Sequence, residues 1–268
     1  MEANKRAVHD FWERAACGEE LYLDGVDRDG YREQAQRRYR LEPYIEPFAA
    51  FDSANGQAVL EVGVGLGADH QRFAAAGARL SGVDLTERAV AHTRRRLAQQ
   101  GLSSNLSVAD AERLPFADAS FDLVYSWGVI HHSPDTPRAV SEVHRVLRPG
   151  GRARVMIYNR HSLVGYMLWA RYGLARLRPQ ATLAEIYARY LESPGTKAYT
   201  AQEARRMFAA FAAVDVRTVL THADLLESDV GQRHRGALLL IARRLWPRAI
   251  LRRVASGRGL FMLISAVK

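Results

Sequence analysis

Three glycines at alternate positions follow a short apolar run, and this spacing suits a loop that binds a nucleoside cofactor. The run Ala58-Val-Leu-Glu-Val62 leads directly into Gly63, Gly65 and Gly67. Glycine allows the sharp turn from strand to helix and lets a ligand lie against bare backbone, where side chains would collide with it. Glu61 lies two residues before the first glycine. A carboxylate at this place repels a diphosphate and suits a cationic ligand, so charge and spacing together predict a site for a cationic nucleoside.

The spacing of the glycines separates two classes of cofactor. Dinucleotide sites use GxGxxG, in which the third glycine allows close helix packing and the helix N-terminus faces a pyrophosphate. This chain has GxGxG instead, which is a weak signal by itself. Together with Glu61 it favours S-adenosylmethionine, which carries a sulfonium and an ammonium group, over a nicotinamide cofactor.

Two further acids follow predicted strands. Asp84 ends the run that begins at Arg79, and a carboxylate at this place in a doubly wound sheet can accept hydrogen bonds from both ribose hydroxyls. Asp110 follows a third strand, where it can hold the adenine amino group while Ala111 lies against the ring. The predicted cofactor contacts also include the neighbours of these acids, Leu85 and Glu112.

A pair of histidines follows the fourth predicted strand, which begins at Phe121. An imidazole can take a proton from a hydroxyl or an ammonium near neutral pH, and a base is needed only when the methyl acceptor carries a proton. His132 or its neighbour His131 is therefore the candidate catalytic base, and the choice between them stays open. The nine histidines and single cysteine show no spacing typical of a zinc site, so no metal is predicted.

These residues require a parallel sheet whose strands end at one edge, and a fifth strand is predicted at Arg152–Tyr158. In the order and spacing of its strand ends, the segment 56–158 resembles the class I S-adenosylmethionine-dependent methyltransferases, specifically the ubiquinone-biosynthesis-like "type 11" group. The resemblance implies an α/β fold with a doubly wound, mainly parallel sheet of seven strands, the last one antiparallel. It also implies that the cofactor binds across the carboxyl ends of strands one to four.

The resemblance assigns cofactor contacts residue by residue. Glu61 and the three glycines match the first motif of the family, Asp84 its ribose-binding acid, and Asp110 with Ala111 its adenine-binding pair. One further segment corresponds to the part of strand four that runs beside the methionine half of the cofactor; it contains Ser126, Trp127 and Gly128.

The length of 268 residues suits a single α/β domain with insertions. We expect a helical cap over 1–50, a cofactor-binding core over 51–158, a helical lid over 159–205 and C-terminal strands with a basic helical insertion over 206–268. In the cap, Trp12 and Tyr22 can form an aromatic wall around the sulfonium through cation–π attraction. Simple packing of these helices onto the sheet explains the same aromatics equally well.

The expected lid overhangs the carboxyl ends of the strands. Its apolar stripe is best explained by packing, whereas its polar rings and the ring at the end of strand five can contact the methyl acceptor. These substrate-binding candidates are Tyr158, His161 and Tyr166.

The second insertion, 231–258, is strongly basic. Between Gly231 and Gly259 it holds eight arginines and no acidic residue. A basic amphipathic helix suits peripheral membrane contact or a lipid-like acceptor; a helix packed on the domain with its arginines in water is the alternative. The net charge of +9 would also suit nucleic acid. However, RNA base methylation usually brings an Asn/Asp-Pro-Pro-Tyr/Phe signature after strand four, and Ser126-Trp-Gly-Val129 stands there, which argues against a nucleic-acid partner.

We therefore expect a methyltransferase (EC 2.1.1.-) that methylates oxygen, nitrogen or carbon of a small or medium-sized metabolite, including lipid-like or aromatic ones. A non-catalytic cofactor-binding scaffold and an RNA methyltransferase are the alternatives. The only cysteine is Cys17, so no intrachain disulfide can form. The lack of a leader and of an apolar run of about 18 residues predicts a cytoplasmic protein, as a monomer or homodimer.

Overall fold

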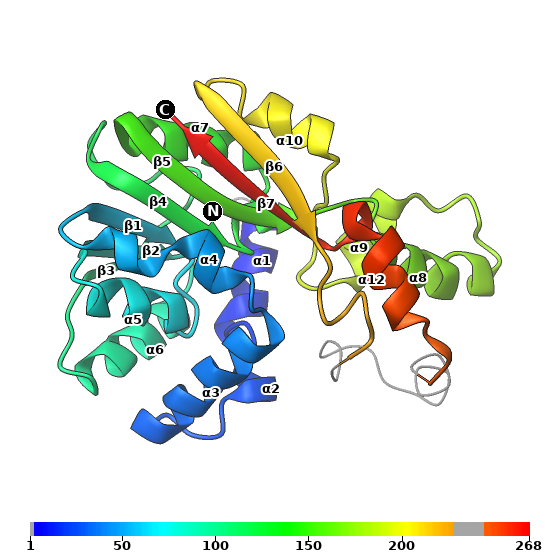
Figure 1. Cartoon of the computed structure of the whole chain (residues 1–268), viewed down its shortest axis with the longest axis horizontal. Helices are drawn as coiled ribbons and strands as arrows, with labels where there is room; N and C mark the ends of the chain where they lie inside the picture. The colour runs from blue at the N-terminus through cyan, green and yellow to red at the C-terminus, as the bar shows by residue number, and fades with distance from the viewer. Residues whose placement is uncertain (1–2, 228–243) are drawn as a thin grey trace.

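A seven-stranded sheet forms the centre of the computed structural model, which describes residues 3–227 and 244–268 (Figure 1). Its strand order is β3-β2-β1-β4-β5-β7-β6. All neighbouring pairs are parallel except those of β7, which runs antiparallel to both β5 and β6. The strands are β1 (Ala58–Val62), β2 (Arg79–Asp84), β3 (Asn105–Val108), β4 (Phe121–Trp127), β5 (Leu147–Tyr158), β6 (Ala213–Val219) and β7 (Phe261–Val267). The predicted doubly wound α/β fold with an antiparallel last strand is confirmed.

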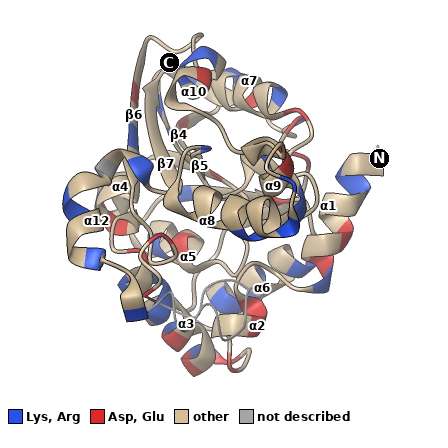
Figure 2. Cartoon of the chain, turned by 90° about the vertical axis from the view of Figure 1, so that its right-hand side faces the viewer, with Lys and Arg blue, Asp and Glu red and all other residues tan. Residues whose placement is uncertain are grey.

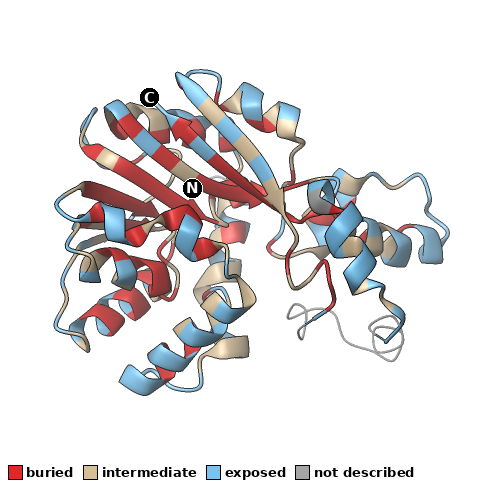
Figure 3. Cartoon of the chain, viewed as in Figure 1, coloured by how far each residue is buried: buried red, intermediate tan, exposed pale blue. Residues whose placement is uncertain are grey.

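Both faces of the sheet are buried, which explains why β1 and β4 are apolar at nearly every position. Successive side chains alternate between two cores: Leu60 and Val124 pack on one face, Val59 and Leu123 on the other. Figure 3 shows the central strands as the buried layer, with exposed residues on the outer helices. The carboxyl ends of β1, β2, β4 and β5 meet at one edge, and the order of strands changes direction at β1, where ligands bind in open α/β sheets.

Helices cover the two faces. Contacts place α5 (Ala68–Ala75) and α6 (Glu87–Ala98) against β2, with α6 also on β3, while α7 (Thr136–Val146) packs on β5 and α10 (Ala201–Met207) on β6. The short α4 (Ile45–Ala49) and the 3-10 helix η1 (Phe51–Ala54) join the core that contains Phe73 of α5.

The N-terminal segment is helical, as predicted. It consists of α1 (Ala3–Arg14), α2 (Glu19–Tyr22) and α3 (Arg28–Leu41). The Asp27 side chain accepts a hydrogen bond from Gly30 N and so caps α3. Asp27 therefore begins α3 within the Asp/Gly-rich stretch Asp24–Gly30.

The segment after β5 is also helical. It contains α8 (Leu163–Tyr172), the 3-10 helix η3 (Leu174–Arg176) and α9 (Leu183–Tyr190), which packs against α8. Figure 1 shows α8 and α9 beyond the ends of β5, β6 and β7, on the same side of the molecule as α12 (Arg248–Val254). This segment therefore lies where the predicted lid was expected.

Only part of the basic insertion belongs to the described residues. The segment 228–243, with Arg233, Arg235 and Arg243, lies outside them. In the described part, Trp246 Nε1 donates a hydrogen bond to Asp224 O at 3.0 Å, which ties the start of α12 to the turn after β6. No helix in residues 3–227 and 244–268 is long and apolar enough to cross a membrane. Figure 2 shows Lys and Arg spread over many helices, with Asp and Glu between them.

Candidate active site

One cavity of about 360 Å³ opens at the carboxyl edge of the sheet, a size typical of small-molecule sites. It begins beside the acids at the ends of β2 and β3, passes the glycine loop after β1 and reaches the residues that follow β4 and β5. Fourteen of the predicted site residues line it: Trp12, Tyr22, Glu61, Gly63, Gly65, Gly67, Asp84, Leu85, Asp110, Ala111, Trp127, Gly128, His132 and Tyr158.

The three glycines of the loop have different structural roles. A Cβ atom added at Gly63 would lie 2.0 Å from Cγ2 of Val129, and one added at Gly67 would lie 2.8 Å from Oγ1 of Thr93. These two glycines are needed for packing within the protein. At Gly65, with φ of +51°, an added Cβ would meet no protein atom within 4 Å. Gly65 is therefore the position where the backbone is left bare towards the cavity, as a bound nucleoside requires.

Glu61 is held by a buried histidine that follows the glycine loop. Its Oε2 lies 2.8 Å from Nδ1 of His70, and Nε2 of His70 lies 2.8 Å from Oγ of Ser104. The Ser104 hydroxyl donates to Leu80 O, so it must accept from Nε2 of His70, and one proton is then shared between Glu61 and Nδ1. Burial raises the pKa of Glu61 and lowers the pKa of His70 to about 3. The pair is therefore neutral overall, with the proton nearer to Glu61.

The acids at the ends of β2 and β3 are fixed differently. Asp84 accepts hydrogen bonds from the backbone and hydroxyl of Thr86 and from Gly65 N, while burial raises its pKa. Asp110 is paired through Oδ2 with Nζ of Lys5 at 2.6 Å, and Lys5 also binds Glu112. Lys5 belongs to α1, so this ion pair holds the N-terminal helix over the predicted adenine end of the cavity.

A buried charged network forms the floor of the cavity beside α5. Asp69 accepts from Nη2 of Arg38 at 2.7 Å and from the hydroxyls of Tyr39 and Tyr125. Burial alone would raise the pKa of Asp69, but the Arg38 guanidinium and these hydrogen bonds bring it below its usual value. Nη1 of Arg38 also lies 3.3 Å from Oε2 of Glu42, so one guanidinium serves two carboxylates.

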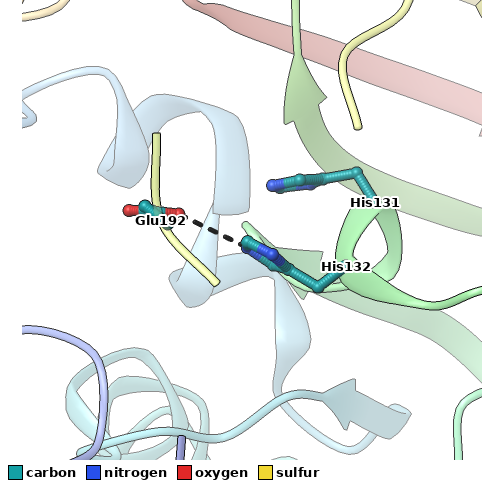
Figure 4. Close-up of side chains that lie close together, drawn as sticks. All are labelled: His131, His132 and Glu192. Atoms are coloured by element: carbon teal, nitrogen blue, oxygen red, sulfur yellow. Dashed lines mark ion pairs between the residues drawn. The ribbon is translucent and has the colours of Figure 1, made fainter. Parts of the chain in front are cut away.

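His132 faces the opposite end of the cavity. Its Nδ1 lies 3.1 Å from Oγ1 of Thr196, whose own proton goes to the backbone oxygen of Ser193. Thr196 can only accept from Nδ1, whereas Oγ of Ser193, 2.8 Å from Nδ1, can accept from it or donate to it. In the tautomer protonated on Nδ1, Nε2 carries a lone pair. Nε2 lies 3.4 Å from Oε2 of Glu192 (Figure 4), and that carboxylate accepts from the Tyr158 hydroxyl at 2.7 Å. The arrangement presents an imidazole nitrogen and a carboxylate to one space.

His131 behaves differently from its neighbour. Its ring is fully buried against the Tyr158 ring, with centroids 4.1 Å apart, and neither ring nitrogen has a hydrogen-bond partner within the described part of the chain. Burial lowers its pKa well below the usual value, so it stays neutral. Figure 4 shows both imidazoles directed towards Glu192. One ligand atom from each of these three residues lies within 4.8 Å of the others, so the group has the donors to hold a metal ion.

Five predicted site residues do not line the cavity, and each has a physical reason. Ser126 is buried and donates to Val62 O, and Glu112 is held by Lys5 and the Ser133 hydroxyl. His131 is fully buried against the Tyr158 ring. The other two, His161 and Tyr166, are exposed and contact each other 3.1 Å apart, because α8 turns that face to solvent; Tyr166 also accepts from Arg258. The structure thus places His161 and Tyr166 outside this cavity, and their contact with a methyl acceptor stays a prediction.

Sequence reasoning missed several cavity residues. Glu42 follows the end of α3, Arg38 lies within α3, Glu192 follows α9, and Phe261 begins β7. None of them belongs to a recognisable motif. Only Glu192 had a local signal, because it stands in a Ser-Pro-Gly turn.

Comparison with known proteins agrees with this geometry. Residues 60–155 match the family described as "Methyltransferase domain". An uncharacterized protein of Mycobacterium tuberculosis is 38% identical over 120 residues, which are 45% of this chain and 44% of that protein. The ubiquinone biosynthesis O-methyltransferase of Aromatoleum aromaticum is 32% identical over 130 residues, covering 47% of this chain and 55% of the relative. The chain thus spans about half the length of the curated relatives it matches.

A solved structure extends the similarity of fold. Phosphoethanolamine N-methyltransferase 2 of Haemonchus contortus, in complex with phosphomonomethylethanolamine and S-adenosylhomocysteine, superposes with a TM-score of 0.61 at 20% identity. The superposition covers 97% of this chain and 60% of that chain. Identity at this level supports the fold alone. Residues 60–155 of this chain match the methyltransferase domain family, and they lie within a fold shared with that S-adenosylhomocysteine-bound methyltransferase.

Proposed function

We propose that this chain transfers the methyl group of S-adenosylmethionine to a small or medium-sized molecule bound beside His132. The observation that carries the proposal is that a single cavity connects Gly65, Asp84 and Asp110 with His132. The first three suit a nucleoside, and the last is a base candidate at the far end. A scaffold that only bound the cofactor would not need a second polar end.

The cofactor fits the residues of the first end. The bare backbone at Gly65 leaves room for it, and Asp84 is positioned by Thr86 to accept from the ribose. Glu61 lines the cavity and suits the ammonium group, since the proton it shares with His70 can move to the imidazole when a cation arrives. When bound, S-adenosylmethionine supplies an electrophilic methyl group.

His132 acts as the base in this proposal. In the tautomer protonated on Nδ1, which donates to Thr196 or Ser193, the lone pair of Nε2 is available to a proton on the acceptor. Glu192 stabilises the imidazolium that then forms, because its Oε2 is 3.4 Å from Nε2. Tyr158 keeps Glu192 in place through its hydroxyl. Trp12, whose ring centroid is 5.5 Å from that of His132, closes the cavity from α1.

The nature of the acceptor follows from what surrounds it. Helices α1 and α3 and the segment after α9 wall the cavity, which suits a small molecule. Relatives are named as methyltransferases of phosphoethanolamine and of ubiquinone precursors, so nitrogen and oxygen acceptors are both represented among them. The cytoplasmic location, the monomer or homodimer and the peripheral membrane contact through 231–258 stay predictions.

The test is calorimetric titration with S-adenosylhomocysteine, using Asp84→Asn and, as a control, Asp215→Asn on the exposed face of β6. Loss of a charged hydrogen bond of about 1.5–3 kcal/mol predicts binding roughly 10- to 100-fold weaker for Asp84→Asn, with no change for the control. Equal affinity in the two variants would refute the ribose assignment. Binding without turnover on any phenol, amine, quinone precursor, lipid or RNA would favour the scaffold.

A further inference from the structure

The cavity is acidic although the protein carries a net charge of +9. Lys5 and Arg38 are the only lysine and arginine side chains among the described residues that line it. Each already serves two carboxylates, Lys5 those of Asp110 and Glu112, and Arg38 those of Asp69 and Glu42. Six carboxyl side chains line the same cavity: Glu42, Glu61, Asp69, Asp84, Asp110 and Glu192. Glu61 shares a proton with His70, but the other five carboxyl groups still outnumber the two cations, which favours a cationic occupant.

Two of these carboxylates, Glu42 and Glu192, are not among the residues assigned to the cofactor. They flank three rings that line the cavity, here called the aromatic wall: Trp127, Phe261 and Tyr158. Within the wall, the Phe261 centroid is 5.8 Å from those of both Trp127 and Tyr158. At one end the Trp127 side chain is hydrogen-bonded to Glu42. At the other, Tyr158 donates to Glu192. The wall therefore has a carboxylate at each end.

Two buried polar atoms at this end of the cavity have no hydrogen-bond partner among the described residues. Oε2 of Glu42 is buried and has no hydrogen-bond partner among the described residues, although Arg38 is near. Nε2 of His132, also buried, has none either, while Oε2 of Glu192 lies 3.4 Å from it. In the tautomer of His132 protonated on Nδ1, Nε2 and Oε2 of Glu192 are two acceptors facing each other. A ligand with N–H donors and a positive charge would satisfy both, whereas an anion would be repelled.

We propose that the methyl acceptor is an amine that enters as an ammonium ion, with its organic part along the aromatic wall. Carboxylates and aromatic rings together are the groups that recognise an ammonium, through ion pairing and cation–π attraction. The inference rests on the proposed methyl transfer and narrows its acceptor from oxygen, nitrogen or carbon to nitrogen.

The transfer step balances with residues already in place. The ammonium gives one proton to Nε2 of His132, which frees the nitrogen lone pair. That pair forms the new nitrogen–carbon bond as the carbon–sulfur bond breaks, and the sulfur keeps the electrons of the broken bond. The nitrogen thereby regains its positive charge, which Glu42 and Glu192 stabilise as it develops. The proton on His132 leaves to solvent after the product departs.

The test compares matched amines and alcohols on the intact chain saturated with S-adenosylhomocysteine. Calorimetry measures the dissociation constants of 2-phenylethylamine against 2-phenylethanol and of tryptamine against tryptophol. The same amines and alcohols are then offered with S-adenosylmethionine, and methylated product is identified by mass spectrometry. We expect at least one amine to bind tenfold or more tightly than its alcohol and to be methylated on nitrogen.

Two variants locate the effect. Glu42→Gln keeps the shape of the side chain and its contact with Trp127 but removes the charge, so amine affinity should fall about tenfold with no change for the alcohols. Glu46→Gln is the control, because Glu46 is exposed and pairs with Arg72 outside the cavity. If no amine binds more tightly than its alcohol while S-adenosylhomocysteine binds, the amine inference is overturned and the methyltransferase proposal stands. If S-adenosylhomocysteine does not bind, both fail.

Discussion

A methyl group added at Gly65 should block the cofactor without harming the fold. Gly65 has φ of +51°, and an added Cβ would meet no protein atom within 4 Å. Alanine in the left-handed region costs about 1–2 kcal/mol. For a chain of this size each kcal/mol lowers Tm by roughly 2–4 °C, so Gly65→Ala should lose about 2–8 °C.

Gly65→Ala should weaken binding of the cofactor more strongly than it lowers the stability of the fold. If the nucleoside lies against Gly65, the methyl group crowds it as an extra methylene crowds a packed core, which costs about 1–3 kcal/mol. This predicts a dissociation constant for S-adenosylhomocysteine raised roughly 5- to 100-fold, measured by calorimetry at a temperature where both proteins are folded.

A matched control separates strain from obstruction. Gly101 also has positive φ, +65°, with open space around an added Cβ, and it lies outside the cavity. Gly101→Ala should lower Tm by the same amount as Gly65→Ala but bind S-adenosylhomocysteine as tightly as wild type. Gly63→Ala should be less stable than either, because its Cβ would overlap Val129. Equal affinities in Gly65→Ala and Gly101→Ala would refute the placement of the cofactor against this loop.

Three further predictions concern charges. Burial raises the pKa of Glu42 to about 7, so the stability that its neutral form provides is present below about pH 4.5 and is lost as pH rises through 7. The free energy of unfolding of Glu42→Gln should therefore exceed that of wild type by up to roughly 3 kcal/mol at pH 8 and match it at pH 4. Thermal melts at the two pH values test this. Lys5→Met removes the ion pairs of α1 with Asp110 and Glu112, each worth about 1 kcal/mol. Proteolysis of α1 should therefore be faster, and affinity for S-adenosylhomocysteine should fall about tenfold. If α1 resists proteolysis as well as in wild type, this prediction is contradicted. Zinc should inhibit methyl transfer by binding His131, His132 and Glu192, and EDTA should reverse the inhibition. His131→Ala should weaken zinc binding at least tenfold, as measured by calorimetry. Unchanged zinc affinity in this variant would exclude these three residues as the zinc site.

The strand ends and the glycine turn at one end of the cavity lie where the local sequence predicts them. The strands β1, β2 and β4, the glycine turn and the acids at the strand ends are all within a few residues of the predicted positions. The reason is that a parallel strand buried on both faces needs a continuous apolar run, and the carboxyl ends of such strands meet at one edge whatever surrounds them. The choice of Gly65 as the bare position could not be read from the spacing, since it depends on the contacts of Val129 and Thr93.

The end of the cavity proposed for the methyl acceptor could not be predicted from the local sequence, because it depends on tertiary structure. Glu42 and Glu192 lie 150 residues apart in the chain, and Lys5 reaches acids more than 100 residues away. No local period encodes such contacts, because they depend on how the helices outside the sheet dock. The same holds for the two histidines, since the short 3-10 helix η2 (Ile130–His132) buries the ring of His131 and presents that of His132 to the cavity. The sequence by itself thus determined which cofactor the chain is built for, through local backbone geometry, whereas the charge of the acceptor end arises only from long-range packing.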